Sequence, residues 1–114
     1  MQTAVEILHF AEKRGEWFDE FAFQVLFSQL HKRLKGEAQG EDRRVISRIC
    51  EKMEDRISSF KQGRTLSSIM YGLCKLDVDP SNRFLKLWSE QCVAVIGTLN
   101  SQDLSNAAYA LAKL

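Results

Sequence analysis

The sequence predicts an all-α protein, an α-solenoid of roughly six helices stacked as antiparallel pairs, with a repeat of about 38 residues. The first observation behind this is that residues 66–76 and 104–114, 38 positions apart, align without a gap and share Leu, Ser, Tyr, Leu, Lys and Leu. The second is that apolar residues recur three and four apart in a chain with one Pro and six Gly. Self-similarity at such a period is typical of repeats that bury their apolar faces by stacking.

The apolar spacing sets the order of the expected helices. A helix at about 3–14, ended by Gly15, would cover the open edge of the helix that follows it. The first helix of each repeat is expected at about 19–35, 65–76 and 101–114, and the second at 43–60 and 80–97. Asp79 as N-cap and Pro80 as first helical residue would start the helix at 80–97. Asn100 or Ser101 would cap the last helix.

These helices form one domain, which we divide into four parts. They are a capping helix at 1–15, a first repeat at 17–60, a second repeat at 64–99 and the first helix of a third repeat at 101–114. The third repeat would lack its second helix. We therefore expect that the array is truncated after residue 114, or that a partner protein covers its open face.

Composition argues against several classes of function. The histidines, His9 and His31, belong to separate predicted helices, and the three cysteines form no CxxC pair, so we expect no metal and no cofactor. Nucleotide-binding and hydrolase motifs are missing from the sequence, which predicts a protein that is not an enzyme. No apolar run approaches the roughly 20 residues of a membrane span. The net charge of +1 gives no support for nucleic-acid binding by itself.

The last eleven residues, Leu-Ser-Asn-Ala-Ala-Tyr-Ala-Leu-Ala-Lys-Leu at 104–114, resemble the first-helix signature of the octotricopeptide repeat family. Residues 7–15, followed by Phe18, are similar to the way many such arrays begin. The family comprises organellar helical-repeat proteins, often with a RAP domain. The resemblance implies RNA binding in a mitochondrion, or alternatively a chloroplast, as an accessory subunit of a mitochondrial ribosome or as a factor for RNA processing or stability.

A helical wheel places the candidate binding residues opposite the apolar face of each repeat's first helix. In the three helices these residues are Val25, Ser28, Gln29 and Lys32; Ser68, Tyr71, Gly72 and Lys75; Asn106, Tyr109, Ala110 and Lys113. An RNA strand needs cations for its phosphates, flat faces for its bases and short polar groups for base edges. We therefore expect RNA contacts at Gln29, Lys32, Ser68, Tyr71, Lys75, Asn106, Tyr109 and Lys113.

The same pattern has a simpler interpretation, which the sequence leaves open. Lysines near helix C-termini interact favourably with the helix dipole and keep the surface soluble, and the tyrosines could pack on the next helix. The chain would then be a non-catalytic protein–protein scaffold subunit of a large respiratory or photosynthetic complex. The near-neutral net charge favours this alternative.

Overall fold

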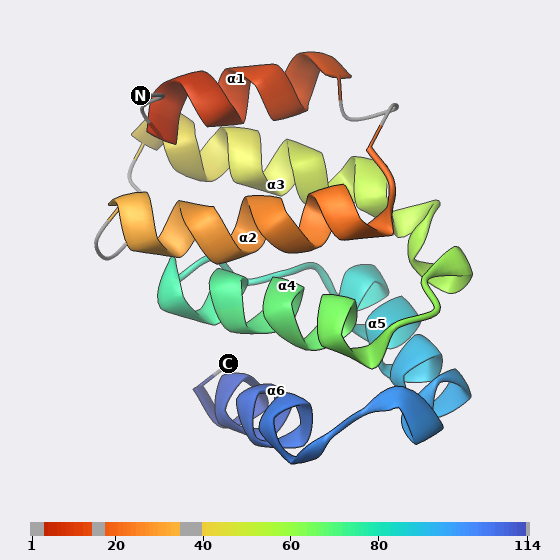
Figure 1. Cartoon of the computed structure of the whole chain (residues 1–114). Coiled ribbons are helices and arrows are strands. Elements are labelled where there is room, and N and C mark those ends of the chain that lie inside the picture. The colour runs from red at the N-terminus through yellow and green to blue at the C-terminus, as the bar shows by residue number, and fades with distance from the viewer. Residues whose placement is uncertain (1–3, 15–17, 35–39, 114) are drawn as a thin grey trace.

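The computed structural model describes residues 4–14, 18–34 and 40–113. These residues form six α-helices and two 3-10 turns, with no strand among them (Figure 1). The helices are α1 (Ala4–Arg14), α2 (Glu20–Leu34), α3 (Gly40–Glu54), α4 (Gly63–Lys75), α5 (Asn82–Ala94) and α6 (Ser101–Lys113), with turns η2 (Ile57–Ser59) and η3 (Ile96–Thr98). The all-α prediction is confirmed. The predicted helix end at Gly15, and residue 114, lie outside the described residues.

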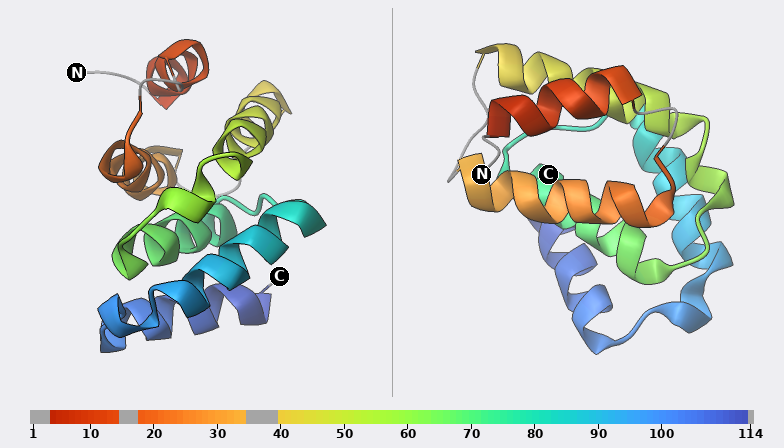
Figure 2. Two further views of the ribbon diagram at one scale, coloured as in Figure 1. Left: turned by 90° about the vertical axis from the view of Figure 1, so that its right-hand side faces the viewer. Right: turned by 45° about the horizontal axis from the view of Figure 1, so that its top comes forward.

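Three helices that the sequence relates to one another lie side by side. α4 packs against α2 on one side and α6 on the other, as Figures 1 and 2 show. Their first residues, Glu20, Gly63 and Ser101, are separated by the same 43 and 38 positions as the sequence copies. α1 packs on α2 and α3, and α3 in turn contacts α5. The described chain has a Cα radius of gyration of 13.0 Å.

The core is built from the apolar faces that the repeat predicts. α2 and α4 bury Phe23, Leu26, Phe27 and Leu30, and Leu66, Ile69, Met70 and Leu73. Trp88 of α5 is also buried, and its indole Nε1 donates a 2.8 Å hydrogen bond to the carbonyl oxygen of Leu66. α6 differs, because the side chains of Leu104 and Leu111 at the corresponding positions are about half exposed.

The helices predicted at 43–60 and 80–97 are both shorter than expected. α3 ends at Glu54 and α5 at Ala94, because in both cases a 3-10 turn follows before the next helix. α5 begins at Asn82, so the start predicted from Asp79 and Pro80 is wrong. The N-cap is Ser81, whose hydroxyl accepts a 3.0 Å hydrogen bond from the backbone N–H of Phe84. This start places Phe84 and Trp88 on the buried face of the helix.

The start of α6 follows one of the two predicted alternatives. Asn100 and Asp103 cap each other: Asn100 Oδ1 accepts from the N–H of Asp103 at 2.8 Å, and Asp103 Oδ2 accepts from the N–H of Asn100 at 3.1 Å. This reciprocal arrangement satisfies two backbone donors that a helix start otherwise leaves unpaired. Asn100 is therefore the cap, and Ser101 is the first helical residue.

The start of α4 is held by side chains from other helices. Its own N-cap residue, Gln62, makes no side-chain capping bond. The carboxylate of Glu20, at the start of α2, accepts hydrogen bonds from the N–H groups of Lys61 and Gln62 at 2.9 and 2.8 Å. The hydroxyl of Thr98, in η3, accepts from the N–H of Gly63 at 2.8 Å. Neighbours on both sides thus satisfy backbone donors at this helix end.

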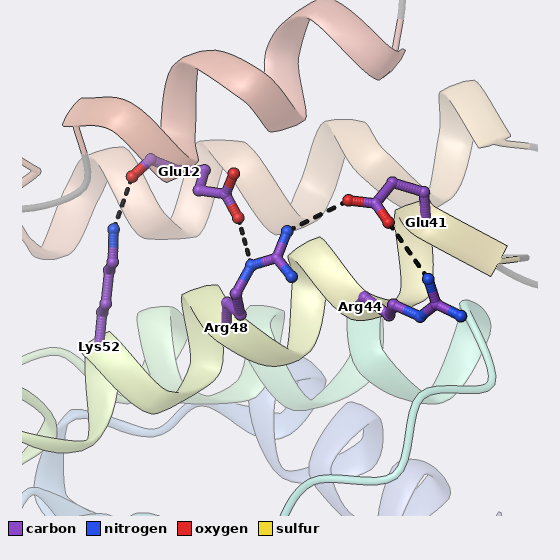
Figure 3. Close-up of polar contacts among 5 residues, drawn as sticks. All are labelled: Glu12, Glu41, Arg44, Arg48 and Lys52. Atoms are coloured by element: carbon purple, nitrogen blue, oxygen red, sulfur yellow. Dashed lines mark hydrogen bonds and ion pairs between the residues drawn. The ribbon is translucent and has the colours of Figure 1, made fainter.

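A polar cluster on the surface fastens α1 to α3 (Figure 3). Arg48 of α3 pairs with the carboxylate of Glu12 and, at 3.3 Å, with Glu41, while Lys52 donates to the carbonyl oxygen of Glu12 at 2.6 Å. The hydrogen bond from Arg48 is the main reason that the pKa of Glu12 lies below its usual value. These groups are solvent-exposed, so screening limits what each pair contributes to stability.

Candidate nucleic-acid interface

The helices α2, α4 and α6 each bring one aromatic ring to the same side of the molecule. The rings belong to His31, Tyr71 and Tyr109. The centroids of His31 and Tyr71 are 5.7 Å apart in an edge-to-face arrangement at 80°, and those of Tyr71 and Tyr109 are 5.8 Å apart and tilted by 43°. These separations fall within the range of favourable aromatic contacts. A continuous line of rings therefore crosses the three helices.

Two lysines lie over these rings. The Nζ of Lys75 is 5.4 Å from the ring centroid of Tyr71 and 5.0 Å from that of Tyr109, so it bridges α4 and α6. The Nζ of Lys113 is 5.6 Å from the centroid of Tyr109. Distances below about 6 Å allow a cation–π attraction. We call the set of His31, Tyr71, Lys75, Tyr109 and Lys113 the cation–aromatic ladder.

The charge of the ladder comes from its lysines. Lys75 donates a hydrogen bond of 3.5 Å to the hydroxyl of Tyr109, and this bond is the main reason that the pKa of Lys75 is raised. Burial lowers the pKa of His31 below its usual value of about 6.5, with further contributions from Lys32 and Lys75. At neutral pH, His31 is therefore mainly an uncharged flat ring beside two ammonium groups.

The structure brings together four of the predicted site residues, Tyr71, Lys75, Tyr109 and Lys113. Lys32 is exposed next to His31, and Ser68 and Asn106 are half-buried one helical turn before the two tyrosines. Gln29 lies elsewhere, in the lining of a groove between α1 and α2. These placements follow from the helix register, which makes Lys32, Lys75 and Lys113 equivalent.

The predicted site does not include His31, because His31 does not occupy the repeat position of the two tyrosines. The position on α2 that corresponds to the tyrosines is Ser28, whereas His31 aligns with Cys74. Residues three apart lie on the same helix face, so His31 can supply the ring that Ser28 lacks. The three-residue spacing between Ser28 and His31 was the signal that could have found it.

The prediction that Gly72 and Ala110 lie on the outer face of their helices is wrong, because both residues are buried between helices. A Cβ atom placed on Gly72 would lie 3.0 Å from both the Cβ and the carbonyl oxygen of Phe27 in α2. A wheel drawn for one helix assumes a single buried side. α4 has neighbours on two flanks as well as the core behind it, so its exposed strip is narrower than the wheel indicates.

The groove beside Gln29 has a volume of about 530 Å³. It is mainly apolar, and its exposed apolar side chains include Phe21 and Phe10, with 65% and 57% of their surfaces accessible. The lining consists of Ile7 and Phe10 from α1, Phe18 before α2, and Phe21, Ala22, Val25, Leu26, Gln29 and Arg33.

Within residues 4–14, 18–34 and 40–113, no three His, Cys, Asp or Glu side chains are grouped to hold a metal ion. No helix in these ranges has the length and apolar character that crossing a bilayer requires. Comparison with family models, with curated proteins and with solved structures gives no match to the chain.

Proposed function

We propose that the chain is a segment of an α-solenoid that binds single-stranded RNA through the cation–aromatic ladder. The observation that carries this proposal is the placement of Tyr71, Lys75, Tyr109 and Lys113 on one side of two adjacent helices. Tyr71 with Tyr109, and Lys75 with Lys113, are equivalent residues of successive repeats, so this part of the ladder is a product of the repeat. Solenoids use such extended, repeated surfaces for binding.

The chemistry of the ladder suits a single strand better than a duplex. Aromatic side chains stack on unpaired bases, whereas the bases of a duplex are already stacked on each other. Lysine ammonium groups beside the rings neutralise phosphates and release their counterions. Ser68 and Asn106 are close enough along their helices to contribute hydrogen bonds to base edges, and Lys32 extends the positive charge onto α2.

The cellular setting of the proposal rests on the resemblance to octotricopeptide repeats. We propose an organellar protein, mitochondrial or alternatively of the chloroplast. Its role would be that of an accessory subunit of a mitochondrial ribosome, or of a factor for RNA processing or stability, and it is proposed to act without catalysis.

Fluorescence anisotropy with a labelled single-stranded RNA tests the proposal. Each phosphate contact to a single strand adds about −0.7 to the slope of log affinity against log salt. Contacts by Lys32, Lys75 and Lys113 thus predict a slope of about −2 and a loss of about 18-fold between about 50 and about 200 mM salt. Replacing one of these lysines by glutamine should lower that loss to about 7-fold.

Variants separate the ladder from general surface charge. The triple change of Lys32, Lys75 and Lys113 to glutamine should abolish the salt-dependent binding, while Lys86→Gln on α5, an exposed lysine outside the ladder, should leave it intact. The double change of Tyr71 and Tyr109 to leucine should weaken binding by about 1–3 kcal/mol per base lost from a ring. Equal affinity for the triple variant and the wild type would contradict the proposal.

A second candidate function, a non-catalytic scaffold subunit of a respiratory or photosynthetic complex, is favoured by a different observation. The apolar groove between α1 and α2 and the half-exposed leucines of α6 are surfaces of a kind that protein partners cover. Absence of RNA binding even at low salt would favour this candidate over the first.

A further inference from the structure

Apolar side chains are exposed on α6 and η3 at positions whose equivalents are buried in the preceding repeat. Leu104 and Leu111 are 50% and 48% exposed, whereas Leu66 and Leu73, 38 positions earlier, are fully buried. Ile96 of η3 is 62% exposed, whereas Ile57 of η2 is fully buried, and η2 packs against α5. Among the described residues, this edge therefore exposes apolar side chains whose equivalents in the preceding repeat are buried.

The groove between α1 and α2 is lined by the α2 positions whose equivalents on α4 and α6 face the preceding helix. α4 turns Thr65 and Gly72 toward α2: Thr65 Oγ1 lies 3.1 Å from Gln24 Oε1, and Gly72 closely approaches Phe27. α6 turns Asp103 toward α4, where its carbonyl oxygen accepts a 2.9 Å hydrogen bond from the hydroxyl of Ser67. The equivalent positions on α2 are Ala22 and Gln29, and both line the groove.

We propose that the protein associates with itself head to tail, with α6 of one molecule packed in the groove between α1 and α2 of the next. The same helix-on-helix contact occurs twice within the chain, from α2 to α4 and from α4 to α6. The proposed interface is its third instance. The proposed occupant is a second copy of the chain, because the exposed face of α6 is equivalent to the faces by which α2 packs on α4 and α4 packs on α6.

Specific contacts follow from the register. Ser105 of α6 is the equivalent of Ser67, and the carbonyl oxygen of Ala22 is the equivalent of that of Asp103. The hydroxyl of Ser105 would therefore donate to the backbone of α2 in the next molecule. Ala108, the equivalent of Phe27, would face Gln29, the equivalent of Gly72, and α1 would cover Leu104 and Leu111.

Charge does not oppose this contact. The exposed face of α6 that enters the groove carries no ionisable side chain at Leu104, Ser105, Ala108, Leu111 and Ala112. Arg33 is the charged side chain of the groove. An uncharged helix face therefore enters a mainly apolar groove, and few ions lose their hydration on association.

Such an interface is heterologous, because it joins two different surfaces, and it can add molecules in one direction. Sedimentation velocity of the RNA-free protein over a wide concentration range should show a mass that rises with concentration. The double variants Leu104→Glu/Leu111→Glu and Phe21→Glu/Val25→Glu each remove one face at exposed positions. Each should be monomeric alone, with helical circular dichroism unchanged.

The mixture of the two double variants gives the decisive result. Each retains the face that the other lacks, so an equimolar mixture should form a one-to-one dimer that does not grow further. Lys86→Glu on α5 serves as the control and should associate like the wild type. A wild type that stays monomeric at all concentrations, a groove variant that still dimerises, or a mixture that stays monomeric would each overturn the proposal. No RNA is present, so the result is independent of RNA binding.

Discussion

Replacing Gly72 by alanine measures how closely α2 and α4 approach each other. In the middle of an exposed helix, this change stabilises a protein by about 1 kcal/mol, because alanine has the higher helix propensity. At Gly72, however, the added Cβ would meet the Cβ and the carbonyl oxygen of Phe27 at 3.0 Å. One of these atoms belongs to the backbone of a packed helix, which cannot rotate away.

The two effects have opposite signs, and the steric one should win. Overpacking of a core by one methyl group costs about 1–3 kcal/mol, which exceeds the gain in propensity. We expect Gly72→Ala to lower the free energy of unfolding by about 0–2 kcal/mol. Gly72→Val, with two more methyl groups against the same backbone, should lower it by about 3 kcal/mol or more.

Gly97 provides the matched control, because a Cβ placed there has no atom within 4 Å. Gly97→Ala should stabilise the protein by about 0.4–1 kcal/mol through the reduced freedom of the unfolded chain. Urea unfolding followed by circular dichroism gives all three values. If Gly72→Ala stabilises the protein as much as Gly97→Ala does, α2 and α4 do not approach as closely as described.

Three further predictions concern local features. Asp77 directly follows the C-cap of α4 and has a φ of 57°, in the left-handed region. Asp77→Gly should therefore raise the thermal midpoint, by relief of about 1 kcal/mol of strain. An unchanged midpoint would argue against this conformation. Because the folded-state pKa of Glu12 is lowered, its contribution to stability is present above a pH of about 4.3 and lost as the pH falls below it. Glu12→Gln should therefore reduce the pH dependence of urea unfolding in acid, whereas parallel profiles for variant and wild type would contradict the pairing with Arg48. Burial raises the pKa of Cys50 to about 12, so at pH 8 mass spectrometry should find it alkylated only after unfolding, and rapid labelling of the native protein would contradict its burial.

The repeated helices α2, α4 and α6 could be predicted from sequence because their apolar faces recur at fixed offsets. The ends of α3 and α5 could not. Ile57 and Phe60 continue the three- and four-residue apolar spacing of α3 and are buried as expected. They reach the core by way of the 3-10 turn η2 and not by a continuation of α3. An α-helix and a 3-10 turn place apolar residues at nearly the same spacing, so the sequence pattern does not distinguish them.

The part of the candidate site that recurs at the 38-residue offset could be predicted from the sequence. Tyr71 with Tyr109, and Lys75 with Lys113, occupy identical positions in their copies, so a shared direction followed from the period alone. His31 joins the ladder from a position outside that register. The lateral contacts that bury Gly72 depend on the distance between helices, which the pattern of a single helix does not contain.

The capping of α4 by its neighbours has a consequence for how the protein unfolds. Glu20 supports the start of this helix from one side and Thr98 from the other, so fraying of α2 or η3 leaves the backbone N–H of Gln62 or of Gly63 without its partner. The middle helix therefore cannot keep its full stability when either neighbour detaches. Loss of structure at an edge should spread inward, and the chain should melt in a single cooperative transition rather than one helix pair at a time.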